Sequence, residues 1–168
     1  PDGTLRTGLE WGGVWTRDVS YSTILSMAYM QPQAAMTSLL CKINSKGEIV
    51  QDTGTGGAWP CSTDRQIWVG AAWEIYKVTG SREWLEKVYP VAKTSLEVDI
   101  RTIYDENTGL AKGESSFIDW RKNSYPIWME PADIYDSKCL GTNMVHYIAL
   151  TSASQMGRIL GDDAAADV

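Results

Sequence analysis

The feature that most constrains this fold is a set of three segments that carry almost no charge and would be apolar on every side of a helix. They are 19–30 (VSYSTILSMAYM), 67–76 (IWVGAAWEIY) and 141–157 (GTNMVHYIALTSASQMG), and only the second contains a charged residue. A helix of this kind is stable where neighbouring elements cover it on all sides. We therefore expect three inner helices, each buried all round.

Helices of a second kind alternate with these inner ones. The segment QAAMTSLLCKI has Pro32 near its first turn, which favours the start of a shorter helix at that point. Thr63 and Gln66 form a capping-box pattern before the second inner helix, and Gly80 follows its expected end. Ser81 then begins a helix with one apolar and one charged stripe, so that helix faces solvent on one side.

The alternation predicts an all-α fold of helical hairpins that form part of a toroid, in which outer helices cover an inner ring. A helical bundle would instead have amphipathic helices throughout. The chain begins at Pro1 without an initiator Met, and it ends soon after Gly161, where a further helix would start. We expect residues 1–168 to be one partial domain of about three hairpins, with the remainder of the toroid outside this chain.

Composition argues against several classes of function. The net charge is −6, from 15 Lys+Arg and 21 Asp+Glu, and we find no basic stripe that would bind a nucleic-acid backbone. No apolar run reaches the ~18 residues of a membrane span. Because His146 is the only histidine and the cysteines are widely spaced, we expect neither a metal site nor another cofactor. Cys41, Cys61 and Cys139 are expected as buried thiols, with one disulfide as the alternative.

The aromatic residues indicate a surface that both stacks and hydrogen-bonds, since 8 Trp and 8 Tyr accompany a single Phe. Several of them lie in loops before the inner helices. GGVWTRD at 12–18 and GGAWPCSTDR at 56–65 share Gly-Gly-x-Trp, and a long loop at 105–136 precedes the third inner helix. If the hairpins stack side by side, the inner-helix N-termini and these three loops gather at one end of the barrel.

The first of these loops combines the groups that recognise a sugar ring. Trp15 offers a stacking face, while Arg17 and Asp18 offer hydrogen-bond donors and an acceptor for hydroxyl groups. The alternative is structural: Asp18 caps the helix, Arg17 is its ion-pair partner and Trp15 belongs to the core. The residues alone leave both interpretations open.

The sequence also resembles a known group of enzymes. GVWTRDVSYS is similar to the Trp-Thr-Arg-Asp-Ser-Ala stretch of glucoamylases and related six-hairpin glycosidases, where it holds the sugar hydroxyls in the −1 subsite. ESSFIDWRKNSYPIW resembles the Glu-Ser-Gly-Trp-Asp-Phe-Ser-Ser-Arg-Trp stretch of trehalases and the comparable loop of processing-glucosidase-like enzymes. STDRQIWVGAAWEIYKVTGS is similar to the second inner helix of this group. The resemblance implies an (α/α)6 toroid and a glycoside hydrolase.

The families resembled hydrolyse with inversion, which needs one carboxylic acid and one carboxylate base. The resemblance assigns the acid to Asp119, whose apolar neighbours, Trp120 among them, would desolvate it and raise its pKa. Glu114 is the competing candidate, and the alternative role for Asp119 is an ion pair with Arg121 that orders the loop. In these families the base comes from a later hairpin, so we expect the rest of the chain or another subunit to supply it.

The remaining candidates for substrate binding are Trp59, Asp64, Trp120 and Arg121. The alternatives are that Trp59 fills the interior of the ring and that Asp64 caps the second inner helix. His146 lies within an apolar helix and is expected as a satisfied core residue. The resemblance favours a terminal neutral sugar, glucose-like, as substrate. The rival interpretations are a non-catalytic carbohydrate-binding α-hairpin module and a polysaccharide lyase on the same toroid.

Overall fold

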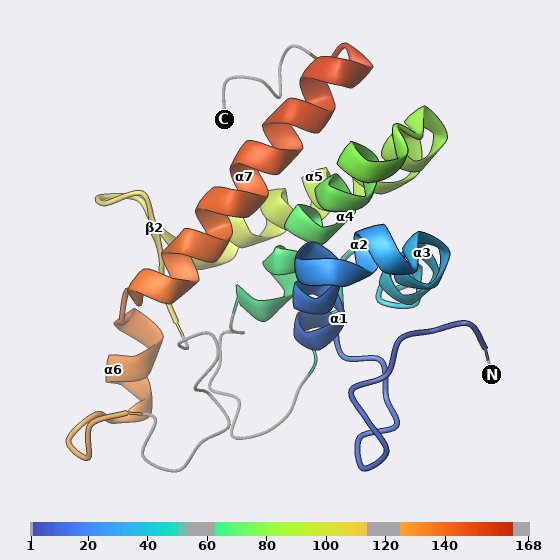
Figure 1. Ribbon diagram of the computed structural model, residues 1–168. Helices are drawn as coiled ribbons and strands as arrows, with labels where there is room; N and C mark the ends of the chain where they lie inside the picture. Colours follow the sequence, from blue (N-terminus) through green and yellow to red (C-terminus); the bar gives the residue numbers. More distant parts are fainter. Residues whose placement is uncertain (1, 51, 53–62, 114–124, 163–168) are drawn as a thin grey trace.

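A computed structural model describes residues 2–50, 52, 63–113 and 125–162, except the side chains of 63 and 64 (Figure 1). The described residues are mainly helical, which confirms the all-α class. The first inner helix is α1 (Thr16–Ser22), which continues through the π-helical η1 (Thr23–Met27) into α2 (Ala28–Met30). The second is α4 (Ile67–Thr79), preceded by the 3-10 turn η2 (Thr63–Gln66), and the third is α7 (Leu140–Leu160). The other elements are α3 (Pro32–Leu40), α5 (Arg82–Ile103), β1 (Tyr104–Asp105), β2 (Leu110–Ala111) and α6 (Pro131–Asp136).

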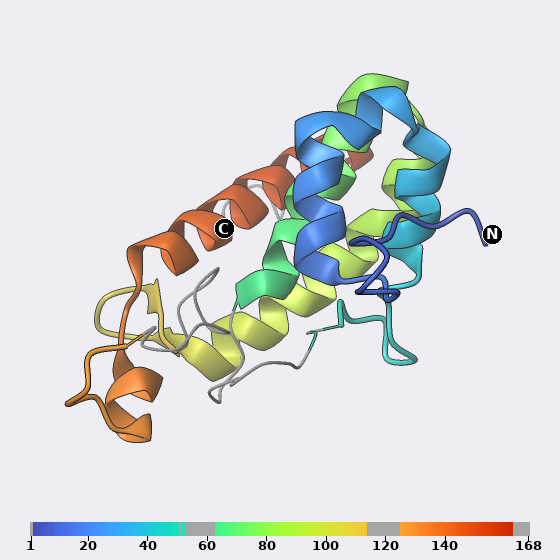
Figure 2. The ribbon, with the colours of Figure 1, turned by 60° about the horizontal axis from the view of Figure 1, so that its bottom comes forward.

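Helix α4 lies at the centre of the arrangement. It contacts the inner helices α1 and α7 on its two sides and the outer helices α3 and α5. Figures 1 and 2 show α1, α4 and α7 side by side and running in the same direction, so that their N-termini lie at one end. The predicted gathering of the inner-helix N-termini is therefore confirmed.

Two buried indoles join the central helix to both outer helices. Trp68 of α4 is fully buried and donates from Nε1 to the carbonyl of Leu39 at the end of α3, at 2.9 Å. Trp84 of α5 donates in the same way to the carbonyl of Ala72 in α4, at 2.9 Å. Each hydrogen bond offsets the desolvation penalty of burying an indole N–H, and each indole ring fills space in the core.

The expected ends of the hairpin helices are confirmed. Gly80 and Gly161 both follow the last helical residue with positive φ, 64° and 83°, a conformation that glycine adopts without strain. Ser81 begins α5 as its N-cap, because its side chain accepts a hydrogen bond from the backbone N–H of Trp84 at 3.1 Å. The apolar stripe of α5 faces the core, as predicted.

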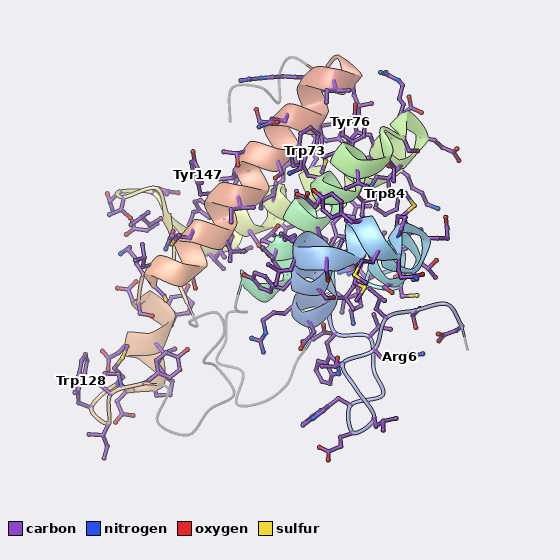
Figure 3. All side chains as sticks on the ribbon, in the orientation of Figure 1. Arg6, Trp73, Tyr76, Trp84, Trp128 and Tyr147 are labelled. Atoms are coloured by element: carbon purple, nitrogen blue, oxygen red, sulfur yellow. The ribbon has the colours of Figure 1, made fainter. Side chains whose placement is uncertain are left out.

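The expectation that every inner helix is buried all round is correct for the first turns of α4, where residues 67–72 are buried, but Trp73 and Tyr76 are half-buried, and it is wrong for the other two helices. Leu25, in the first inner helix, is 78% exposed, and Tyr29 is also exposed. On α7, Met144 and Tyr147 are exposed, and Figure 3 shows Tyr147 pointing away from α4. Among the described elements, α3, α4 and η2 contact α1, and α4, α5, η2 and β2 contact α7. No helix within the described ranges is long and apolar enough to span a membrane.

Two local predictions are also wrong. Gln66 does not complete a capping box, because Thr63–Gln66 forms a 3-10 turn and the Gln66 amide donates to Asp99 of α5 instead. The long segment 105–136 is not wholly irregular, since β1 and β2 pair as an antiparallel hairpin and α6 follows it. Helix α6 begins with a capping box between Glu130 and Asp133. The sequence did not predict this helix, because six residues are too few to show a clear helical periodicity.

Leu85 provides a test of this core. It is fully buried in the contact between α5 and α4, so Leu85→Ala should lower the free energy of unfolding of the complete protein by about 2–5 kcal/mol. Denaturant titration measures the change. Lys87→Ala, on the exposed face of the same helix, is the matched control and should stay within about 0.5 kcal/mol of the native protein. Equal effects of the two substitutions would contradict the described packing of α5.

Candidate functional site

The N-terminus of α1 is capped from a distant part of the chain. Trp15 occupies the N-cap position, and the backbone N–H of Thr16 donates to the carboxylate of Asp52. The ammonium group of Lys42 forms an ion pair with the same carboxylate and donates to the carbonyl of Val14 at 2.9 Å. Asp52 therefore caps this helix end, while Asp18 is an acidic residue within the first turn, and the alternative in which Asp18 is the cap is wrong.

Arg17 and Asp18 line an open pocket of about 520 Å³ between the first turns of α1 and the N-terminal segment. Asp18 is exposed, whereas Arg17 is half-buried. The other lining residues supply hydroxyl groups, a guanidinium group and apolar surface: Leu5, Arg6, Thr7, Val19, Tyr21 and Ser22. The pocket thus combines hydrogen-bond donors, acceptors and apolar patches, a mixture that suits a polyhydroxylated ring.

The N-terminal segment that forms one wall of this pocket is fastened by Arg6. Its guanidinium group donates to the carbonyl of Gly12 and forms an ion pair with Asp2, and Figure 3 shows it on the segment below α3. The backbone N–H of Leu5 also donates to the side chain of Ser38 in α3, at 2.7 Å. These bonds hold the segment against α3 and leave the pocket between it and α1.

Trp15 is half-buried and belongs to an aromatic pair at the edge of this region. Its ring lies edge-to-face with the exposed ring of Trp11, with centroids 6.3 Å apart and planes at 77°. A Cβ atom on Gly13 would come within 3.1 Å of the Trp15 indole nitrogen, so the glycine lets the backbone approach the ring. Trp15 is therefore neither a core residue nor fully free to stack.

A buried ion pair lies at the N-terminus of α4. Arg65, in η2, pairs with Asp99 of α5, which is only 4% exposed and also accepts from the Gln66 amide. Gln66 reaches the carbonyl of Ser95 as well, at 3.3 Å. Sequence reasoning missed Asp99, although an acidic residue on the apolar stripe of α5 is the signal that would have found it. Asp64 belongs to η2, but its side chain lies outside the described atoms.

His146 forms a second buried polar contact, between α7 and β1. It is 2% exposed, and its Nδ1 lies 2.8 Å from the hydroxyl oxygen of Tyr104. Burial lowers the pKa of His146 to about 4 and raises that of Tyr104 to about 12. The core location is as predicted, but the ring is only half satisfied, because Nε2 has no hydrogen-bond partner among the described residues.

Most of the predicted catalytic apparatus lies outside the described residues. This applies to both acid candidates, Asp119 and Glu114, and to the predicted substrate-binding residues Trp59, Trp120 and Arg121. Cys61 is outside them too, whereas Cys41 is exposed and Cys139 is half-buried. The expectation of a buried thiol is therefore wrong for Cys41. Of the predicted site residues, the structure brings together Trp15, Arg17 and Asp18 at the start of α1.

These features define the class of protein. The described residues form inner and outer helical hairpins, with a pocket at the N-terminus of the first inner helix. Residues 15–168 match the family described as the bacterial alpha-L-rhamnosidase 6 hairpin glycosidase domain. The chain belongs to this family of six-hairpin glycosidases, whose substrates are carbohydrates. Comparison with curated proteins and with solved structures finds no match.

The buried state of His146 predicts a pH dependence of stability. The unfolded chain binds a proton below about pH 6.5, but the folded chain does so only below about 4. Stability should therefore be complete above pH 6.5 and fall, by up to about 3 kcal/mol, as the pH drops through this window. Urea titrations of the complete protein at several pH values measure this slope. In His146→Gln, which cannot titrate, the slope should be smaller, and an unchanged slope would contradict the assignment.

Proposed function

We propose that this chain forms part of the active site of a glycoside hydrolase that removes a terminal neutral sugar with inversion of the anomeric centre. The observation that carries the proposal is the pocket at the start of α1, where Arg17 and Asp18 face the space beside the N-terminal segment. Membership of a six-hairpin glycosidase family supports the same reaction class. The pocket would hold the ring of the sugar that is released.

The pocket suits a neutral sugar for reasons of charge. The charged residues that line the pocket are Arg6, which forms an ion pair with Asp2, Arg17 and Asp18, so groups of both signs border the space for the ligand. A neutral ring with several hydroxyls uses both groups, as a bidentate donor and an acceptor. The family description names L-rhamnose and the resemblance favours glucose, and both are neutral pyranoses of this kind. We therefore propose the neutral pyranose as the substrate class.

In the proposed mechanism, Asp119 is the general acid that protonates the leaving oxygen, with Glu114 as the competing residue. A carboxylate from another part of the protein activates water on the opposite face of the sugar. Inverting enzymes hold two such groups about 6.5–9.5 Å apart, which leaves room for the water. Arg17 and Asp18 would hold the ring hydroxyls, so that the scissile bond stays between acid and base.

Hydrolysis of aryl glycosides tests the reaction class. The complete protein should hydrolyse aryl glycosides of one neutral pyranose, with L-rhamnose and D-glucose as the first sugars and both anomers of each. Because general acid catalysis contributes about 10²–10⁴-fold, Asp119→Asn should lower turnover by at least about a hundredfold with substrate binding retained. A fall in Glu114→Gln alone would move the acid to Glu114. Turnover of none of the glycosides would contradict the proposal, and an unsaturated product would indicate a lyase.

The pocket residues have a separate test. Asp18→Asn removes a charged acceptor for a sugar hydroxyl, so kcat/KM should fall by about 10–100-fold, the effect of losing about 1.5–3 kcal/mol. Glu83→Gln is the matched control, because Glu83 is the acidic residue in the first turn of α5, as Asp18 is in α1. Steady-state kinetics compare the two variants. Equal kcat/KM values would place the sugar elsewhere.

A further inference from the structure

The start of α1, whose first turns border the pocket, is fastened to the chain that follows α3. The hydroxyl of Thr16 donates to the carbonyl of Val50 at 3.0 Å, and its backbone N–H donates to the carboxylate of Asp52. Thr16 is only 1% exposed, so both hydrogen bonds lie away from solvent. Arg17 and Asp18 follow directly in the chain and line the pocket. They therefore extend from a residue that two hydrogen bonds fix.

Lys42 holds the Asp52 carboxylate in place. Its ammonium group pairs with Oδ1 of Asp52, while Oδ2 accepts from the N–H of Thr16. The side chains of the ion pair are only 11% and 18% exposed, so water competes little for these contacts. The same ammonium group donates to the carbonyl of Val14 at 2.9 Å. The ion pair thus bonds the backbone on both sides of Trp15.

The turn that leads from Lys42 toward Asp52 is anchored in the core. The backbone N–H of Val50 donates to the carbonyl of Lys42 at 2.8 Å, which closes the turn. The backbone N–H of Ile49 donates to the hydroxyl oxygen of Ser95 in α5 at 2.9 Å, and both residues are buried. Packing against α5 therefore sets the position of this turn, and the turn in turn holds the start of α1.

The cap from Asp52 also determines what Asp18 is able to bind. Asp18 is the third residue of α1, the position from which a carboxylate commonly accepts a hydrogen bond from the N–H groups at the start of its own helix. Here Asp52 accepts from the Thr16 N–H, and Asp18 is exposed at the pocket. Removal of the Asp52 carboxylate would leave that N–H without its acceptor and favour a turn of Asp18 back toward the helix end.

We propose that Asp52 is a positioning residue for Arg17 and Asp18, the proposed sugar-binding pair. It holds the first backbone N–H of α1 and so sets where the two side chains enter the pocket. The inference rests on the proposed function, since it assumes that this pocket holds the sugar. Asp52 acts through the backbone of Thr16 and does not touch the substrate.

A double-mutant cycle on the complete protein tests this role, with the aryl glycoside that the native protein hydrolyses best. Asp52→Ala should lower kcat/KM by about tenfold or more, because misplaced binding groups lose contacts with the transition state. In the Asp18→Asn background the same substitution should lower kcat/KM by no more than about threefold, because a group that it positions is already changed. A merely structural defect would reduce the amount of active protein by the same factor in both backgrounds.

A conservative variant keeps the test decisive where Asp52→Ala folds poorly. Asp52→Asn retains an oxygen acceptor for the Thr16 N–H, as asparagine is a favourable N-cap, but loses the ion pair with Lys42. It should lower kcat/KM by about three- to tenfold, a smaller loss than that of Asp52→Ala. This loss should again shrink in the Asp18→Asn background.

Asp162→Ala is the matched control. The Asp162 carboxylate likewise accepts from a lysine, Lys93, at 2.8 Å, but it follows the C-terminal end of α7, whereas Asp52 lies at the N-terminus of α1. Because distant sites act independently, kcat/KM should stay within about twofold of the native value. The Asp18→Asn background should not change this ratio.

The outcomes separate this inference from the proposed function. Native protein that hydrolyses a glycoside, with no loss in the Asp52 variants or with equal losses in both backgrounds, overturns the positioning role alone. Native protein that hydrolyses none of the glycosides overturns the proposed function and the positioning role together. A loss in Asp52→Ala or Asp52→Asn that depends on Asp18, and is absent from Asp162→Ala, supports both.

Discussion

The burial of α4 is the constraint on which the rest of the structure depends. A helix that is apolar on nearly all sides needs neighbours around it, and here α1, α3, α5 and α7 contact α4 and bury most of it, while Trp73 and Tyr76 stay half-buried. The hydrogen bonds from the Trp68 and Trp84 indoles then fix the positions of α3 and α5 along the axis of α4. Because α1, α4 and α7 run in one direction, the same packing brings their N-termini to one end (Figure 2).

Ion pairs near the inner-helix N-termini involve aspartates that lie outside the candidate sugar pocket. Asp52 caps α1 and pairs with Lys42, so Asp18 is not needed at the helix end and remains exposed beside the pocket. Asp99 neutralises Arg65 inside the protein, where an uncompensated guanidinium group would be costly. Asp52 and Asp99 thus lie outside the candidate sugar site and form ion pairs at the N-termini of the first two inner helices.

The order of the helices could be predicted from the nearly charge-free segments. The helix ends could be predicted from Gly80, Ser81 and Gly161, because these signals depend only on neighbouring residues. The uncovered faces of the first inner helix and α7 did not follow, since an apolar sequence does not reveal which neighbours are present. The cap from Asp52 was equally hidden, because its partner lies 36 residues away in the sequence. The pocket was predicted through Arg17 and Asp18, but the N-terminal segment that forms its other wall has no distinctive pattern.

A crystal structure of the complete protein with the neutral pyranose that it hydrolyses best is the measurement that tests the central claim most directly. The account predicts a sugar ring in the pocket beside α1, with hydroxyl groups within hydrogen-bond distance of Arg17 and Asp18. A carboxyl group from the loop that begins at Gly113 should face the glycosidic oxygen. A sugar bound away from the N-termini of the inner helices would contradict the account.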